Sequence, residues 1–257
     1  MLGGQFRSLT SYRASFAVEV ATNLGVASLD VLTVLVLFRV TRTIGGFELR
    51  EAVVVVGLSA CAFAAADLVV GNVDQLKRYV RTGLLDAILV RPLGVLPQLI
   101  AMDPPLRKVS RVLVSAGVLV TAVTVAGIDW NVQRVLLLIA TPLLGMVFFG
   151  SIFVGSASLA FWWVESGEVG AAFTYGGRDF TAYPIPVYSG WFRAVFAYGL
   201  GFGFVAYYPA LALLGRPDPL GLPSWVGWVS PLVAVPAAGA AAAAWRVGLR
   251  QYRSTGS

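Results

Sequence analysis

The chain has 257 residues, of which 58% belong to the apolar set AVILMFWYC and only 12% are charged, with a formal net charge of +6. A soluble domain typically carries ~25% charged residues, so this chain has too few to cover a surface facing water, and a lipid-facing surface resolves that shortage. With no histidine and with Cys61 as its single cysteine, the sequence excludes an intrachain disulfide, a thiolate metal site and the commonest general base.

Long apolar segments predict an all-α fold, a polytopic membrane protein with six transmembrane helices in one transmembrane domain. Inside the hydrocarbon every segment must satisfy its own backbone hydrogen bonds, so apolar runs of ~17–25 residues indicate spanning helices. The six runs are 16–38, 52–70, 112–128, 135–164, 191–214 and 225–245. The chain is thereby divided into segments 1–15, 16–70, 71–111, 112–164, 165–190, 191–245 and 246–257.

The basic residues predict the orientation. An even number of spans places both termini on one side, and cytoplasmic loops carry an excess of lysine and arginine. Fourteen of the 19 basic residues fall on one side, namely Arg7, Arg13, Lys77, Arg78, Arg81, Arg91, Arg107, Lys108, Arg111, Arg178, Arg193, Arg246, Arg250 and Arg253. That side, with both termini, is predicted to be cytoplasmic. Because these residues flank apolar segments instead of forming a patch, we expect no nucleic-acid partner.

Residues 1–15 are predicted to form an amphipathic helix in the cytoplasmic interface of the membrane. Leu2, Phe6, Leu9 and Tyr12 recur at helical spacing with polar residues between them. Such a helix either anchors the chain to lipid or couples movement at the interface to the first span.

Asp30 is the most unusual residue of the first span. A carboxylate among apolar neighbours costs ~2.5–3.5 kcal/mol to insert at a helix centre, so Asp30 is expected to face protein or water. Pairing with another chain and lining a substrate path are both open for it.

Segment 74–93, within the cytoplasmic segment 71–111, has an amphipathic helical pattern. Its two faces carry the apolar residues Leu76, Tyr79, Val80, Leu84, Ile88 and Leu89 and the polar residues Lys77, Arg78, Arg81 and Asp86. Gly83 is expected to break it into two short helices, and Pro92 to end it. The segment is either a solvated loop or a helix that docks onto a cytoplasmic partner.

The fourth run has 30 residues, or ~45 Å as a helix, against a hydrocarbon core of ~30 Å. It must therefore tilt, kink near Pro142 or project into the cytoplasm, and projection would present Glu165 and Glu168 to a partner. The neighbouring aromatic residues also fit an interfacial belt. In the fifth run, Gly199 and Gly203 have the GxxxG spacing that indicates close helix contact.

The sequence contains no GxxxxGK[ST] phosphate-binding loop, so it has no ATP site of that type. If the protein drives transport with ATP, another polypeptide must hydrolyse it. No motif of a membrane enzyme is present, and we do not expect catalysis by this chain.

Five motifs resemble the type-2 ATP-binding-cassette permeases, in particular a bacterial subgroup of permeases of similar length. The motifs are RTGLLDAILVRPL at 81–93, FWWVE at 161–165, YPIPVY at 183–188, YYPA at 207–210 followed by Leu214 and Gly215, and WRVGLRQYRSTGS at 245–257. The resemblance runs nearly end to end, and the order and spacing of the motifs carry it.

The resemblance implies an exporter subunit in the bacterial inner membrane, with six spans, cytoplasmic termini and a coupling helix that fits a groove in a separate nucleotide-binding ATPase. ATP and Mg would be bound by that ATPase, and no cofactor by this chain. The residues implied for coupling are Leu76, Tyr79, Arg81, Leu84, Leu85, Asp86, Arg91 and Pro92, with Glu165 and Glu168 in a second contact.

Asp30, Gly199 and Gly203 would lie on the translocation path or a subunit interface. The second permease would be a non-identical chain or a second copy, and the substrate hydrophobic, lipid-like or a drug, as in multidrug efflux. Two other hypotheses stay open. The protein could be a membrane scaffold or regulatory subunit that transports no substrate, or a secondary transporter that works without ATP.

Overall fold

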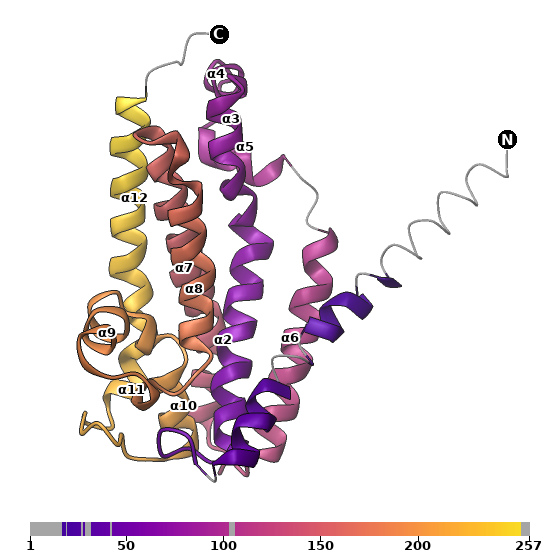
Figure 1. Cartoon of the computed structure of the whole chain (residues 1–257), viewed down its shortest axis with the longest axis vertical. Helices are drawn as coiled ribbons and strands as arrows, with labels where there is room; N and C mark the ends of the chain where they lie inside the picture. Colours follow the sequence, from indigo (N-terminus) through magenta and orange to yellow (C-terminus); the bar gives the residue numbers. More distant parts are fainter. Residues whose placement is uncertain are drawn as a thin grey trace, which may run out of the picture.

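The computed structural model describes residues 17–18, 20–26, 28, 32–41, 43–102 and 106–252. Within these ranges the protein is helical, and the β-structure consists of one isolated bridge between Ile44 and Phe47 (Figure 1). The predicted all-α class is therefore confirmed. The predicted interfacial helix 1–15 and Asp30 lie outside the described residues.

Among the described residues, four helical segments are long and apolar enough to cross a membrane: Leu49–Arg81, Lys108–Val125, Val132–Phe161 and Val226–Gln251. They contain the long helices α2 (Leu49–Val70), α6 (Leu106–Val125), α7 (Val132–Ser158) and α12 (Ala234–Gln251). They match the expected runs 52–70, 112–128, 135–164 and 225–245. Of run 16–38 the structure describes parts, in which 20–26 and 32–40 are helical, so the count of six spans stays a prediction.

Helix α2 is the centre of the bundle, since it packs against both α6 and α7, and α7 in turn packs against α12. Small residues make the crossings close. A Cβ on Gly57 would lie 3.0 Å from the backbone of Leu119 on α6, and one on Gly145 of α7 would lie 2.6 Å from the Cβ of Ala62. Glycines at these points let the backbones approach, as helix contacts in membranes require.

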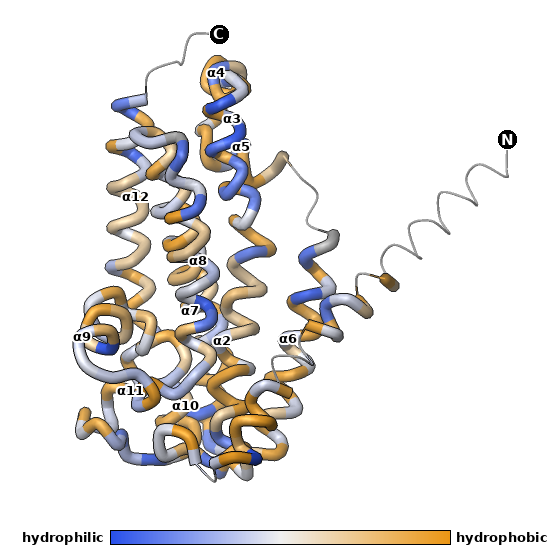
Figure 2. Tube along the Cα trace, in the orientation of Figure 1, coloured by the Kyte–Doolittle hydropathy of each residue, from blue (hydrophilic) through white to orange (hydrophobic). Residues whose placement is uncertain are grey.

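The chain after α2 folds into a cap of short helices, which we call the α3–α5 end of the bundle (Figure 1). The cap consists of η1 (Gly71–Gln75), α3 (Leu76–Arg81), α4 (Leu84–Leu89) and α5 (Val95–Ala101). Gly83 adopts the left-handed conformation, with φ of +71°, and separates α3 from α4 as predicted. Figure 2 shows hydrophilic residues gathered at this cap, and the C-terminal end of α12 lies at the same end.

Helix α8 returns from the α3–α5 end along the bundle. After η2 (Leu159–Phe161) and η3 (Val164–Ser166), α8 (Gly167–Thr181) begins with Gly167 against the side chain of Lys77. It packs against α2 and α7, and at its other end Thr181 lies 2.5 Å from the hydroxyl of Ser59 in the middle of α2. The sequence predicts 165–190 as a cytoplasmic segment, whereas much of it runs beside two spans.

The chain then reaches the opposite end of the bundle. A Cβ on Gly45, in the turn before α2, would lie 3.2 Å from Pro186 in η4 (Ile185–Val187). Residues 167–187 therefore pass from the α3–α5 end to the end at which α2 begins. This passage escapes a hydropathy scan because α8 carries several polar side chains.

Residues 190–214 form a re-entrant hairpin, and the prediction of one continuous span at 191–214 is wrong. The hairpin consists of α9 (Gly190–Arg193), the π-helical η5 (Ala194–Gly199), η6 (Phe202–Phe204) and α10 (Tyr207–Leu214). Its two arms are bent by 63° relative to each other. Gly201 has φ of +84°, a left-handed conformation that an α-helix cannot contain, and it forms the bend.

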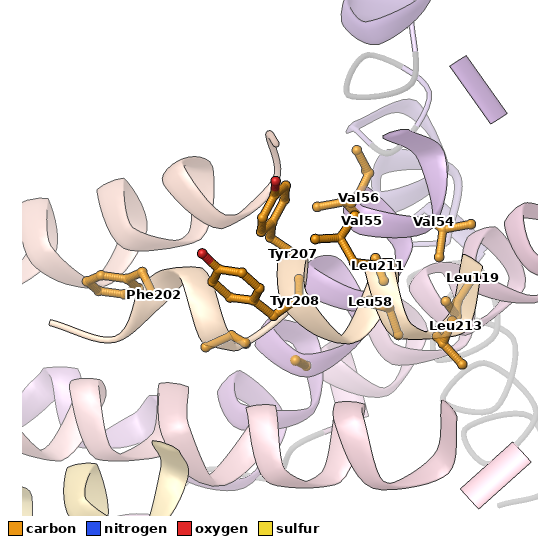
Figure 3. Packing of buried hydrophobic residues seen from close by; sticks show 14 of the residues in the cluster. Val54, Val55, Val56, Leu58, Leu119, Phe202, Tyr207, Tyr208, Leu211 and Leu213 are labelled. Carbon is orange, nitrogen blue, oxygen red and sulfur yellow. The ribbon is translucent and has the colours of Figure 1, made fainter. Parts of the chain in front are cut away.

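The contacts of the hairpin show that it enters and leaves at the same end. At its apex, Gly201 contacts Phe148 in the middle of α7. At its exit, Gly215 lies beside Arg134 in the first turn of α7. Figure 3 shows Tyr207 and Leu211 of α10 facing α2, so the exit arm joins the main core. The chain returns to the α3–α5 end through α11 (Val226–Val229), η7 (Ser230–Val233) and α12.

Candidate functional site

The α3–α5 end is docked firmly on the bundle through one face of its short helices. Leu76, Tyr79 and Val80 of α3 and Leu85 and Ile88 of α4 are buried. They form a second apolar cluster, separate from the main core, with residues from the end of α7 and from α12 such as Val154 and Trp245. A displacement of these helices therefore has to displace the ends of α7 and α12 as well.

Leu84 lies on the opposite side from the one that the sequence pattern predicts. It is 51% exposed, whereas its neighbour Leu85 is fully buried. The pattern assumed one helical phase through the segment, but the left-handed turn at Gly83 rotates α4 relative to α3. Leu85, implied as a contact residue for a partner, therefore belongs to the interior, and Leu84 belongs to the surface.

Apolar side chains remain uncovered on the outer side of the cap. We call Leu84, Leu89, Val90, Arg91, Pro92 and Leu93 the distal surface. Val90 is 84% exposed and Leu93 is 67% exposed. Contiguous exposed apolar groups rimmed by charge indicate an interaction site.

Gln98 of α5 fixes the loop that carries the distal surface. Its buried Nε2 donates hydrogen bonds to the backbone oxygens of Ile88, at 3.1 Å, and Leu93, at 2.7 Å. Both ends of the loop are thereby held to one side chain. Gln98 is not among the residues predicted for the site, although an amide inside the apolar stretch VLPQLIA is a usable signal.

Two polar contacts join the cap to the neighbouring elements. Arg81 donates to Glu165 at 2.7 Å, so two of the predicted coupling residues bind each other. Tyr252, just after α12, donates to Asp86 at 3.2 Å. Burial and the nearby Asp86 carboxylate raise the pKa of the Tyr252 phenol, which keeps it protonated as a donor. Glu168, the other residue of the predicted second contact, is exposed.

Asp67 holds together the point at which α2 meets the cap. Its buried carboxylate accepts from Arg111 at 2.5 Å and lies 3.1 Å from Nζ of Lys108, both on α6. Lys108 also donates to the side chain of Asn72 in η1. Next to it, Tyr175 of α8 donates to Asp74 at 3.2 Å. The cap is thus tied by polar groups to α2, α6 and α8.

Arg178 of α8 lies between two cavities. The first, of about 170 Å³, is lined by residues of α2, α6 and α8, such as Arg111 and Tyr175, and by Asn23 and Val26. The second, of about 280 Å³, includes Ser59 and Asp179. Arg178 also lies over the ring of Phe63, 5.7 Å from its centroid.

Gly199 and Gly203 do not lie on one face of a continuous helix, because the bend at Gly201 separates them. A Cβ on Gly203 would overlap Ile185 of η4. This glycine therefore makes a close contact with η4, and not the contact between two spans that GxxxG spacing predicts. Whether either glycine lines a path stays a prediction.

A family model described as "ABC-2 family transporter protein" matches residues 24–256. The match covers the four candidate spans, the cap, α8 and the hairpin. The comparisons with curated proteins and with solved structures gave no match.

Proposed function

The chain belongs to the ABC-2 transporter family, and we propose that it is the permease subunit of an ATP-driven exporter whose ATPase is a separate chain. The observation that carries the proposal is the distal surface. It presents Leu84, Leu89, Val90 and Leu93 beside Arg91 on a loop that Gln98 holds in place. Apolar anchors next to an arginine are typical of the centre of a protein interface.

The contacts of the cap support a mechanism for coupling. Closure of an ATPase dimer would push on the distal surface, and the cap would transmit the push through three connections. Asp67, where α2 meets the cap, binds α6. The ion pair of Arg81 with Glu165 connects the cap to the start of α8, and the buried face of α3 and α4 packs against α7 and α12. Such gating needs two arrangements of similar energy that ATP binding biases.

We place the chain in a bacterial inner membrane, with the α3–α5 end in the cytoplasm, beside a second permease that is either non-identical or a second copy. The substrate is hydrophobic, lipid-like or a drug. ATP and Mg are bound by the ATPase.

A pair of identical substitutions tests the distal surface. Val90→Asp places a carboxylate on it, whereas Val132→Asp changes a valine of similar exposure, 75% against 84%, at the opposite end of the bundle. We expect copurification of the ATPase to fall at least tenfold with Val90→Asp and to persist with Val132→Asp. Leu85→Asp is unsuitable, since Leu85 is fully buried and its loss would disrupt folding.

The alternatives make different predictions for the same preparation. A scaffold or regulatory subunit would retain an ATPase partner but give no substrate-dependent ATP hydrolysis. A secondary transporter would move substrate with no nucleotide-binding chain attached. If no ATPase copurifies with folded wild-type protein, the exporter proposal is refuted.

A further inference from the structure

A groove of about 540 Å³ lies at the α3–α5 end of the bundle, where α12 and α2 flank α7 (Figure 1), and we call it the cap groove. Its lining residues come from 66–70 of α2, 146–154 of α7, 238–249 of α12 and 94–97 at the start of α5. All four segments belong to the described part of the chain. The volume lies within the ~300–1,000 Å³ of typical ligand sites.

The cap groove is apolar along its length and charged at one end. Of the described residues that line it, Arg246 alone is charged, and the hydroxyl of Ser151 is already bonded to the backbone oxygen of Val147 within α7. From Arg246 the lining extends back along α12 to Ala238, eight residues or ~12 Å away. One leaflet, half of a hydrocarbon core of ~30 Å, is ~15 Å thick. The groove therefore has about the length of one lipid chain within a leaflet.

Two arginines without a counter-charge lie at the mouth of the cap groove. Arg246 and Arg250 are four residues apart on α12, so they lie on the same face of the helix, and both are exposed. Helix α12 carries no acidic residue. The ion pairs between described residues are formed by other basic side chains, namely Arg81, Lys108, Arg111, Arg178 and Arg216. A guanidinium matches a phosphate group by forming two parallel hydrogen bonds, so the mouth suits a phosphate.

The walls of the cap groove are held in place by contacts behind them. Trp245 of α12 is buried, and its ring packs edge-on against Phe161, with the two centroids 5.2 Å apart. On the other wall, Gln98 ties α5 to the backbone of Ile88 and Leu93. The groove is thus formed before a ligand enters it, and binding needs little rearrangement of the protein.

We propose that the cap groove binds an anionic phospholipid of the leaflet at the α3–α5 end. The phosphate lies beside Arg246 and Arg250, and one acyl chain lies along α12 between α2 and α7. A zwitterionic headgroup would bring its own cation next to two arginines, so the site selects lipids of net negative charge. Because α5 forms one wall and α12 another, the bound lipid joins the cap to the last span and stabilises this arrangement of the two.

Native mass spectrometry of the full chain in a non-ionic detergent tests the headgroup part of the site. The probes are phosphatidylglycerol, phosphatidylcholine with the same chains, and glycerol 3-phosphate. We expect the first phosphatidylglycerol to bind at least tenfold more tightly than the first phosphatidylcholine. The double variant Arg246→Gln, Arg250→Gln should remove this preference. Arg78→Gln, which changes an exposed arginine at the same end of the bundle but outside the groove, should preserve it.

Two neighbouring alanines of α12 test the acyl-chain part separately. Ala242 and Ala243 are both exposed, but Ala242 lines the cap groove and Ala243 does not. Ala242→Phe fills the groove from its open side and should weaken phosphatidylglycerol at least tenfold, whereas Ala243→Phe should leave its binding unchanged. Equal effects of the two substitutions, or equal affinity for glycerol 3-phosphate and phosphatidylglycerol, would overturn the placement of the chain.

Equal binding of the two lipids to wild-type protein, or an unchanged preference in the double arginine variant, would overturn the headgroup site. Both substituted arginines are exposed, so loss of the preference reports on binding and not on unfolding of the core. Because the assay uses the isolated chain, its result does not depend on an ATPase. The lipid site and the exporter proposal can therefore fail separately.

Discussion

Two adjacent glycines of α8 allow a sharp test of the hairpin, because one of them faces its apex and the other faces open space. A Cβ on Gly177 would overlap the ring of Phe202, whereas a Cβ on Gly176 would meet nothing within 4 Å. Phe202 is buried and has little freedom to move, since its ring lies among Phe148, Phe149 and Phe180. Gly177→Ala should therefore be less stable than Gly176→Ala.

The magnitudes follow from two opposing terms. Replacing glycine by alanine inside a helix stabilises it by ~1 kcal/mol, and both variants gain this term. Overpacking a filled core costs ~1–3 kcal/mol, and Gly177→Ala alone incurs it. We expect Gly176→Ala to be ~1 kcal/mol more stable than wild type, and Gly177→Ala to lie ~1–3 kcal/mol below Gly176→Ala. At ~2–4 °C per kcal/mol, the two midpoints of thermal unfolding differ by several degrees.

Thermal unfolding in a mild detergent, followed by intrinsic tryptophan fluorescence, measures this difference. Phe202→Ala introduced into both backgrounds should lower stability in each, because it empties a buried site, and should bring the two glycine variants closer together, because it removes the overlap. If Gly176→Ala and Gly177→Ala unfold at the same temperature, Phe202 does not lie against α8, and the hairpin does not reach the middle of the bundle.

Three further predictions concern topology, the junction of α2 with the cap, and the exit of the hairpin. In a Cys61→Ala background, Val187→Cys and Trp225→Cys should react with an impermeant maleimide from the same face of the membrane, and Glu168→Cys from the other face. Labelling of positions 187 and 225 from opposite faces would mean that residues 190–214 cross the membrane. Asp67→Asn should lower the free energy of unfolding by ~1–3 kcal/mol, below the full cost of breaking a buried ion pair because its partners are partly exposed. Asp179→Asn, with a 74% exposed side chain, should stay within ~0.5 kcal/mol of wild type in the same denaturation assay. Asp218→Asn should loosen the exit of the hairpin, where the carboxylate accepts from Tyr207 and from the backbone of Leu220 and Leu222, and increase proteolysis between 215 and 225.

Hydropathy predicted the long spans well, because α2, α6, α7 and the segment that ends in α12 are apolar over a full membrane thickness. The break at Gly83 was also predictable, since glycine supplies the left-handed residue that a tight turn between helices needs. What the pattern could not supply was the phase of α4 after that turn. The left-handed turn at Gly83 rotates α4, and for this reason Leu84 is exposed and Leu85 is buried.

The hairpin and α8 escaped prediction for a common reason. Hydropathy records how apolar a segment is, and a re-entrant hairpin surrounded by other helices is as apolar as a span. Conversely, α8 packs against α2 and α7 although it carries Glu168, Arg178 and Asp179, so its polar residues hide it from a hydropathy scan. The cavity of about 170 Å³ next to Arg178 was missed with it, since Arg178 was counted only as a basic residue of a cytoplasmic loop.

The apex of the hairpin also has a consequence for how the chain is synthesised. Irregular backbone at membrane depth is tolerated only where protein surrounds it. At Gly201 that surrounding includes Phe148, which is made earlier, but also Val233, which the ribosome adds 32 residues later. The apex therefore cannot complete its packing while its own residues leave the ribosome, because Val233 has not yet been made. Residues 190–214 have to wait at the membrane or in the insertion machinery until the start of α12 arrives, and truncation before Val233 should leave a chain in which α2 and α7 are inserted but the hairpin is not.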